Sequence, residues 1–227
     1  MSLNIDKIIK SQFDAFFKEN GYKLLMKNTY GRIVNYNIIQ FVVFSKDMKR
    51  ANTFDVDFAI NLNFIRRNPP VKGILNIKPG STINIFAAKG TPFNRQFVLK
   101  NDVSDEIIIS EIKLLFYHVF DWFNNHMELS IILELFKDPI FCQPDNNWNN
   151  YNIINILLAM GKENEAKELL VKILAKENLY PFLKETCLEI KNILEENGST
   201  QEYFNHNIRE NIKGLKLENF YDNIDLL

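Results

Sequence analysis

The sequence predicts an α+β fold, in which an antiparallel β-sheet packed with helices is followed by an α-helical C-terminal extension. Three observations lead to this prediction. Apolar and polar residues alternate from Phe54 to Phe64, which is the period of a strand with two different faces. The strand-like segments are not followed by helices of crossover length, which disfavours a parallel sheet. Beyond residue 150 the apolar residues follow the helical period only.

The N-terminal elements follow from these periods. Apolar residues at helical spacing predict a helix over residues 5–19, which Asn20-Gly21 ends. Runs rich in β-formers over 22–30 and 33–44 predict a hairpin that turns at Gly31-Arg32. The strand over 54–64 ends before a loop, because Pro69 and Pro70 cannot donate ladder hydrogen bonds. Shorter runs at 74–77, 82–87 and 97–99 extend the sheet into an antiparallel meander.

The second half of the chain reads as helices. The period predicts helices over 105–125 and 128–137, and the segment 138–150, with Pro144 and many asparagines, reads as an irregular boundary. A helical hairpin around Gly161 follows, then a helix over 180–196 and one that opens at the capping box Ser199-Thr200-Gln201-Glu202. The predicted units are a sheet domain over 1–138 and a helical extension over 151–227.

Composition and charge narrow the classes of function. The 227 residues carry a net charge of -1, which disfavours general binding to nucleic acid. No uninterrupted apolar stretch approaches the ~20 residues of a membrane helix, and the first residues lack the layout of a secretion signal, so we expect a cytoplasmic protein. Cys142 and Cys187 form no C-x-x-C pair and read as reduced, buried thiols. No cofactor motif is present, and we expect none to bind.

One face of the central strand carries a row of polar side chains. Asp55 and Asp57 lie about 7 Å apart on one face, and Asn61 and Asn63 continue the row beyond Ala59. This row is a candidate polar binding face, although the solvated side of an antiparallel sheet explains the same residues. The two carboxylates are also the type of ligand that holds a divalent metal ion. We predict no metal site, because the solvated sheet face accounts for the pair and no Gly-Ser turn that could grip a phosphate precedes the strand.

Trp148 is the other residue that the sequence singles out, because it is an indole within an asparagine-rich run. Such a residue either fills the junction between two subdomains or forms part of a contact surface. The histidines and cysteines suggest no catalytic group. His118 and His126 are about 12 Å apart along one predicted helix, and Cys142 has no neighbouring base.

The N-terminal part resembles a known family. The segments are Phe16-Phe17-Lys18-Glu19-Asn20-Gly21-Tyr22-Lys23, then Asn37-Ile38-Ile39-Gln40-Phe41-Val42-Val43-Phe44-Ser45-Lys46, and Phe54-Asp55-Val56-Asp57-Phe58-Ala59-Ile60-Asn61-Leu62-Asn63. In this order they resemble the opening helix and the first three strands of the bacterial domain of unknown function 4304 family, over roughly residues 5–137. The resemblance implies a bacterial protein with this fold. It implies no mechanism, because the family has no established activity.

These observations favour a non-enzymatic protein-binding module of an adaptor or immunity-like type, which we expect to bind another protein through the polar sheet face or the helical hairpin. The alternative is a metal-dependent enzyme that uses Asp55 and Asp57. The two differ in whether the carboxylates meet a third acidic group in a concave site. The sequence leaves the oligomeric state open.

Overall fold

A computed structural model describes most of the chain. The residues it describes are 5–26, 28–35, 38–47, 49–50, 52–66, 82–84, 96–98, 104–125, 127–139, 146–196 and 198–215. The predicted strand at 74–77, Cys142, His126 and the C-terminal residues after 215 lie outside these ranges. The described helices include none that is both long enough and apolar enough to cross a membrane.

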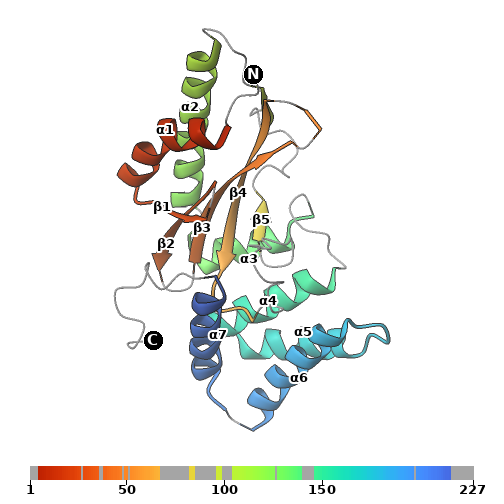
Figure 1. The fold of residues 1–227 in the computed structure, drawn as a ribbon. Helices are drawn as coiled ribbons and strands as arrows, with labels where there is room; N and C mark the ends of the chain where they lie inside the picture. The colour runs from red at the N-terminus through yellow and green to blue at the C-terminus, as the bar shows by residue number, and fades with distance from the viewer. Residues whose placement is uncertain are drawn as a thin grey trace.

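The described strands form one antiparallel sheet, which confirms the predicted α+β class. They are β1 (Lys23–Met26), β2 (Thr29–Asn35), β3 (Ile38–Lys46), β4 (Thr53–Leu62), β5 (Thr82–Asn84) and β6 (Gln96–Val98). The order is β1-β2-β3-β4-β5, so consecutive strands are neighbours and the sheet is a meander; β6 also pairs with β4. The longest ladder joins β3 to β4, with Ile38 opposite Leu62 and Lys46 opposite Phe54. Figure 1 shows β4 running from the α2 end of the molecule to its C-terminal helices.

The predicted turn at Gly31-Arg32 is wrong. Gly31 lies inside β2, opposite Lys23 of β1 and Phe41 of β3. The chain turns earlier, next to Asn28, whose φ of 65° is left-handed. A Cβ at position 31 would lie 2.4 Å from Cδ1 of Leu25, so the Leu25 side chain would have to move to admit a larger residue. Glycine within a strand thus marks a close approach, and the sequence alone does not separate that role from a turn.

Two helices cover one face of the sheet. α1 (Ile5–Glu19) and α2 (Ser104–Asn125) lie on the face formed by the even-numbered residues of β3 and β4 (Figure 1). Aromatic rings fill the space between them: Phe17 of α1 stacks on Tyr30 with ring centroids 4.2 Å apart. Phe116 of α2 meets Phe58 of β4 edge-on at 5.5 Å. Burial of one such ring contributes about 1.5–3 kcal/mol, so the aromatic content is explained chiefly by this core.

A polar cluster closes the end of this core. Gln40, which is fully buried, accepts hydrogen bonds from Tyr22 at 2.8 Å and from Nε of Arg32 at 3.0 Å. Arg32 also donates to the Asn20 carbonyl, at the end of α1, and to the Asn124 side chain, near the end of α2. The carbonyls at a helix C-terminus carry partial negative charge. Arg32 therefore ties the ends of both helices to the sheet.

The C-terminal half is helical, as predicted. Its helices are α3 (Leu129–Lys137), α4 (Asn147–Ala159), α5 (Glu163–Leu174), α6 (Pro181–Glu195) and α7 (Thr200–Leu215). Pro181 occupies the first turn of α6, and the Ser199 hydroxyl accepts from the Glu202 amide at the start of α7. Gly161, with a φ of 72°, separates α4 from α5. These are the helix signals that the sequence contains.

The start of α4 differs from the prediction. Asn147 to Asn150, which read as an irregular segment, form its first turn. Asn146 caps this turn, because its side chain accepts from the Trp148 amide at 2.8 Å. Asparagine favours loops and helix N-caps for the same reason, since its side chain competes for backbone partners. The run therefore contains a cap and a helical turn, and Trp148 lies on a helix.

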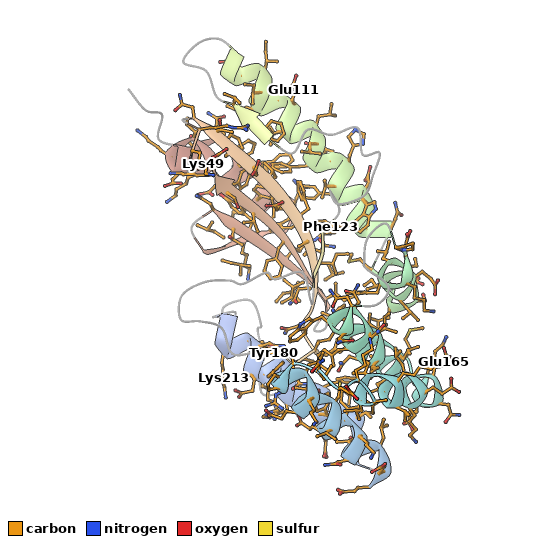
Figure 2. The ribbon with its side chains drawn as sticks, turned by 90° about the vertical axis from the view of Figure 1, so that its right-hand side faces the viewer. Lys49, Glu111, Phe123, Glu165, Tyr180 and Lys213 are labelled. Carbon is orange, nitrogen blue, oxygen red and sulfur yellow. The ribbon has the colours of Figure 1, made fainter. Side chains whose placement is uncertain are left out.

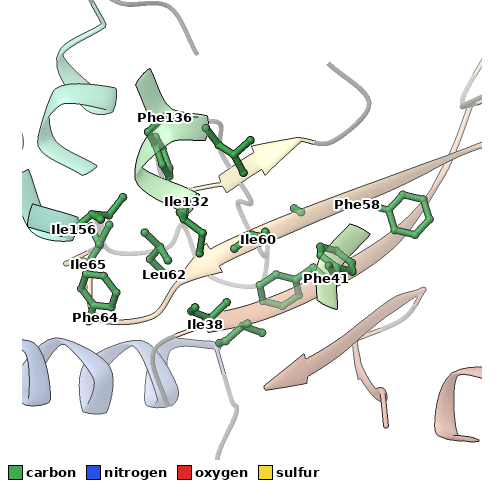
Figure 3. Close-up of a cluster of buried hydrophobic side chains, with 14 of the residues drawn as sticks. Ile38, Phe41, Phe58, Ile60, Leu62, Phe64, Ile65, Ile132, Phe136 and Ile156 are labelled. Atoms are coloured by element: carbon green, nitrogen blue, oxygen red, sulfur yellow. The ribbon is translucent and has the colours of Figure 1, made fainter. Parts of the chain in front are cut away.

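The helical part and the sheet share a continuous hydrophobic core. Figure 3 shows Leu62 and Ile65 from the end of β4 beside Ile132 of α3 and Ile156 of α4. α4 lies at the centre of the helical part, where every residue from Tyr151 to Leu158 is buried. The proposed division into units 1–138 and 151–227 stays a prediction.

Candidate functional site

The predicted polar row on β4 is only partly accessible. Asp55 and Asp57 are partly exposed, whereas Asn61 and Asn63 are 0% exposed. Asn61 lies opposite Ile39 of β3, and Ala59 lies opposite Phe41, and both β3 residues are also buried. The far half of this sheet face is therefore an interior surface. An open face that carries all four residues is incorrect.

The sequence contains a signal for this burial. β3 is apolar at nearly every position from Ile38 to Phe44, which is typical of a strand covered on both faces. The alternation in β4 shows that its two faces differ, yet it cannot show what covers the second face. Burying the side-chain amides of Asn61 and Asn63 at these positions costs free energy. In the described part of the chain, neither amide atom of Asn61 has a hydrogen-bond partner, and Oδ1 of Asn63 has none.

Asp55 and Asp57 are the carboxylates on which the metal-dependent alternative rests. Among the described residues, no group of three or more histidine, cysteine, aspartate or glutamate side chains is placed to hold a metal ion. The described part of the chain thus supplies no third acidic ligand beside this pair. His118 and His206 are exposed on α2 and α7, in different parts of the fold.

The end of β4 is held among the C-terminal helices. After Leu62 the chain turns, and the carbonyls of Asn63, Phe64 and Ile65 leave the ladder while these residues stay buried. Two α7 side chains supply their hydrogen bonds. Nδ2 of Asn211 donates to the Asn63 carbonyl at 2.6 Å and to the Ile65 carbonyl at 2.9 Å. Nδ2 of Asn207 donates to the Phe64 carbonyl at 3.1 Å. The two asparagines are four residues apart and so share one face of α7.

Arg66 continues this junction toward α6. Its guanidinium pairs with Glu189 at 2.6 Å and with Glu185 at 3.1 Å, and it lies over the Phe182 ring, 5.6 Å from the centroid. Burial by itself lowers the pKa of Arg66, but the two glutamates outweigh it and raise that pKa. The Arg66 carbonyl also accepts a hydrogen bond from the Tyr151 hydroxyl at 3.4 Å. Sequence reasoning missed this junction, because its partners are more than eighty residues away along the chain.

Two buried hydroxyls lie beside the junction. The Tyr151 and Tyr203 oxygens are 3.5 Å apart, and both side chains are buried. Burial raises the pKa of Tyr203 to about 12 and that of Tyr151 well above its ordinary value. Burial likewise raises the pKa of Cys187 to about 12, so this thiol is protonated at neutral pH. A protonated, buried thiol is a packing residue, as the sequence suggested for Cys187.

Trp148 belongs to a group of rings at the N-terminal ends of α4 and α6. Its ring stacks on Phe182 at 6.0 Å and lies 5.9 Å from Tyr180 and 6.4 Å from Tyr151. Trp148 and Phe182 are partly exposed, and Tyr180 is 52% exposed. We call Trp148, Tyr180 and Phe182 the aromatic cluster. It is connected to the end of β4 through Phe182, on whose ring Arg66 lies, and through Tyr151, which packs on Trp148 and donates to the Arg66 carbonyl.

Comparisons with known proteins complete this description. A scan of family models finds no match, and searches of curated proteins and of solved structures find no match either. The resemblance of residues 5–137 to the domain of unknown function 4304 family therefore stays a prediction, and the functional argument rests on the residues of this chain.

Proposed function

We propose that this protein is a non-enzymatic protein-binding module, of an adaptor or immunity-like type, that binds its partner through the aromatic cluster. The observation that carries the proposal is the exposure of this cluster. Tyr180 leaves about half of its side chain in solvent, while Trp148 and Phe182 are partly covered beneath it. The cluster is thus a supported aromatic surface with one projecting ring.

The composition of this surface is that of a protein interface. Tryptophan, tyrosine and arginine are the residues that most often contribute large binding energies. The aromatic cluster supplies the first two, and Arg66 lies against its Phe182 ring. The rings already pack on one another, so little side-chain entropy is lost when a partner docks. Lys176, which donates to the Asn147 side chain at 2.7 Å, adds a polar group beside the cluster.

The chemistry of the buried groups supports a binding role over catalysis. Cys187 and the tyrosines at the junction are buried, and burial raises their pKa values away from neutral pH. A catalytic nucleophile or base instead needs a pKa near the working pH and access to substrate. Asp55 and Asp57 are partly exposed, and within the described ranges they belong to no group of three or more possible metal ligands, so the metal-dependent function is not the one that we propose.

A comparison of how strongly point variants bind the partner tests the proposal. The protein is used as bait in lysate of its native host, and the partner that it retains is identified and purified. Tyr180→Ala is expected to weaken binding of the purified partner by about tenfold or more, which is the loss of one strong interface residue. Tyr180 is a surface residue, so this variant is expected to unfold at the wild-type temperature.

Val171→Ala is the matched control. Val171 is an apolar residue of α5 that is 66% exposed and lies outside the aromatic cluster. The proposal requires Val171→Ala to bind as the wild type does. Equal affinities of the Tyr180→Ala variant and the wild type, measured by calorimetry on the purified pair, contradict the proposed surface. Turnover of a substrate by the purified chain contradicts the non-enzymatic role.

A further inference from the structure

Among the residues that the structure describes, none covers an apolar and acidic surface on α2. The buried side of this helix faces the sheet, where Phe123 is fully buried, whereas Glu111 lies on the outer side (Figure 2). Three large apolar side chains also lie on the outer side, and each leaves more than half of its area exposed. We define the outer face of α2 by Glu106, Ile107, Glu111, Leu114, Tyr117 and Asp121.

Two of the apolar residues of this face are aligned along the helix. Ile107 and Leu114 are seven residues apart, which is two helical turns, so they project in nearly the same direction. Tyr117 lies one turn beyond Leu114 and meets the Phe16 ring of α1 edge-on, with the ring centroids 5.3 Å apart. Their exposed fractions are 61% for Ile107, 57% for Leu114 and 55% for Tyr117. Single exposed apolar residues are ordinary, but an aligned series indicates a surface that binds.

The charges on this face identify the kind of partner. Glu106, Glu111 and Asp121 alternate with the apolar residues, and all three are exposed. Glu128, just before α3, is exposed as well, and Ile131 of α3 is 37% exposed; Glu134 of α3 is exposed but pairs with Lys137 at 3.0 Å. Among the described residues of α2 there is one lysine, Lys113, and it is partly buried at the border of the face. A second copy of α2, or any acidic surface, would bring like charges together.

We infer that the outer face of α2 binds a basic amphipathic helix of a partner protein, with apolar residues on one side and lysine or arginine beside them. Apolar residues of such a helix contact Ile107, Leu114 and Tyr117, while its cations meet the glutamates and Asp121. A helix laid along another helix buries a line of residues with this spacing. The inference rests on the proposed protein-binding role, but the surface is separate from the aromatic cluster.

The test uses a peptide as the probe. A fluorescent peptide of about 18 residues is made with leucine on one helical face and lysine elsewhere, a length at which such a helix forms on a surface. Fluorescence anisotropy is expected to show saturable one-to-one binding to the full chain. Binding weakens as salt is added, because exposed charges are screened. A peptide of the same composition in scrambled order, and one with glutamate in place of lysine, are expected not to bind.

Variants assign the binding to the face. Leu114→Ser, which removes the central apolar contact, and the double variant Glu111→Lys/Asp121→Lys, which reverses two charges, are each expected to weaken binding by about tenfold or more. Glu163→Lys/Glu168→Lys on α5 is the matched control, since both of its residues are exposed glutamates far from α2 in the fold. Circular dichroism is used to confirm that each variant is folded.

The outcomes separate this inference from the proposed function. Equal losses for the α2 and α5 charge reversals, or binding of the scrambled peptide, mean that attraction is nonspecific and overturn the inference. A wild-type chain that forms dimers which Leu114→Ser dissociates also overturns it, because the occupant is then a second copy. Tyr180→Ala is expected to leave peptide binding unchanged, so each of the two surfaces can fail without the other.

Discussion

Asn211→Ala is the perturbation that most directly tests how the sheet is joined to the C-terminal helices. The Asn211 amide donates to two backbone carbonyls, and the residue is 6% exposed. Leaving one buried carbonyl without its donor costs about 1–3 kcal/mol, so the two carbonyls together account for about 2–6 kcal/mol. Alanine returns about 0.5 kcal/mol through its higher helix propensity. We expect the free energy of unfolding to fall by about 1.5–5.5 kcal/mol.

The size of the loss can be compared within the same helix. Asn207→Ala frees one backbone carbonyl, that of Phe64, and also removes the hydrogen bond between Asn207 and the Tyr203 side chain, so it is expected to cost about 1–3 kcal/mol. Asn205→Ala is the control, because its side chain accepts only from Gln201 at the surface of α7. Its effect is expected to stay within about 0.5 kcal/mol. A loss for Asn211→Ala no larger than that of Asn205→Ala refutes the assignment of the junction.

The two tryptophans provide the assay. Trp122 lies on α2 in the sheet part, and Trp148 lies on α4 in the helical part. Urea unfolding is therefore followed by fluorescence in Trp122→Phe and Trp148→Phe backgrounds, each of which leaves one reporter. We expect the two reporters to give the same midpoint in the otherwise native chain, because the parts share one core. With Asn211→Ala added, the Trp148 reporter is expected to unfold at lower urea concentration than the Trp122 reporter.

Three further predictions concern single residues. Asn61→Leu is expected to raise the free energy of unfolding, measured by urea titration, by about 1 kcal/mol, because an apolar side chain replaces a buried amide without hydrogen bonds. A decrease in that free energy would show that the amide is satisfied by bound water. Gly161→Ala is expected to lower it by about 1 kcal/mol, since no atom lies within 4 Å of the added Cβ and only the positive φ is strained; a neutral result in the same titration would contradict the left-handed conformation. Burial raises the pKa of Tyr203 from 10.0 to about 12, so its contribution to stability is complete below pH 10 and is lost as pH rises toward 12. A Tyr203→Phe variant has no such group to titrate, and a melting temperature that falls as steeply with alkaline pH as in the native chain would show that Tyr203 is not responsible.

Local patterns determined the helices and the class of the sheet. The predicted helix 5–19 coincides with α1, and the stripe that includes Ile112, Leu115 and Phe116 is the buried side of α2. Period, caps and prolines act within a few residues, so they can be read from the chain alone. The hairpin turn was misplaced because Gly31 lies within a strand, beside Leu25 of the neighbouring strand. A contact between two strands cannot be read from a local pattern.

The two candidate surfaces were likewise indicated in part by the sequence and decided in part by the packing of helices. The sequence singled out Trp148 by its composition, but its place on α4 beside Tyr180 and Phe182 required the packing of two helices. Ile107, Leu114 and Tyr117 lie off the buried stripe of α2, and that position is the signal that the sequence contained for the outer face. Their exposure depends on what else covers the helix, which no local pattern states.

The sequence by itself determined that this protein is an α+β chain with an aromatic core, an alternating central strand and helices at its C-terminal end. Only the tertiary structure decided that the second face of that strand is interior at Asn61 and Asn63, and that Asn207 and Asn211 hold the end of the strand. Both facts are contacts between residues distant in the chain. Burial and hydrogen-bond partners are properties of pairs of segments, and a periodicity describes one segment at a time.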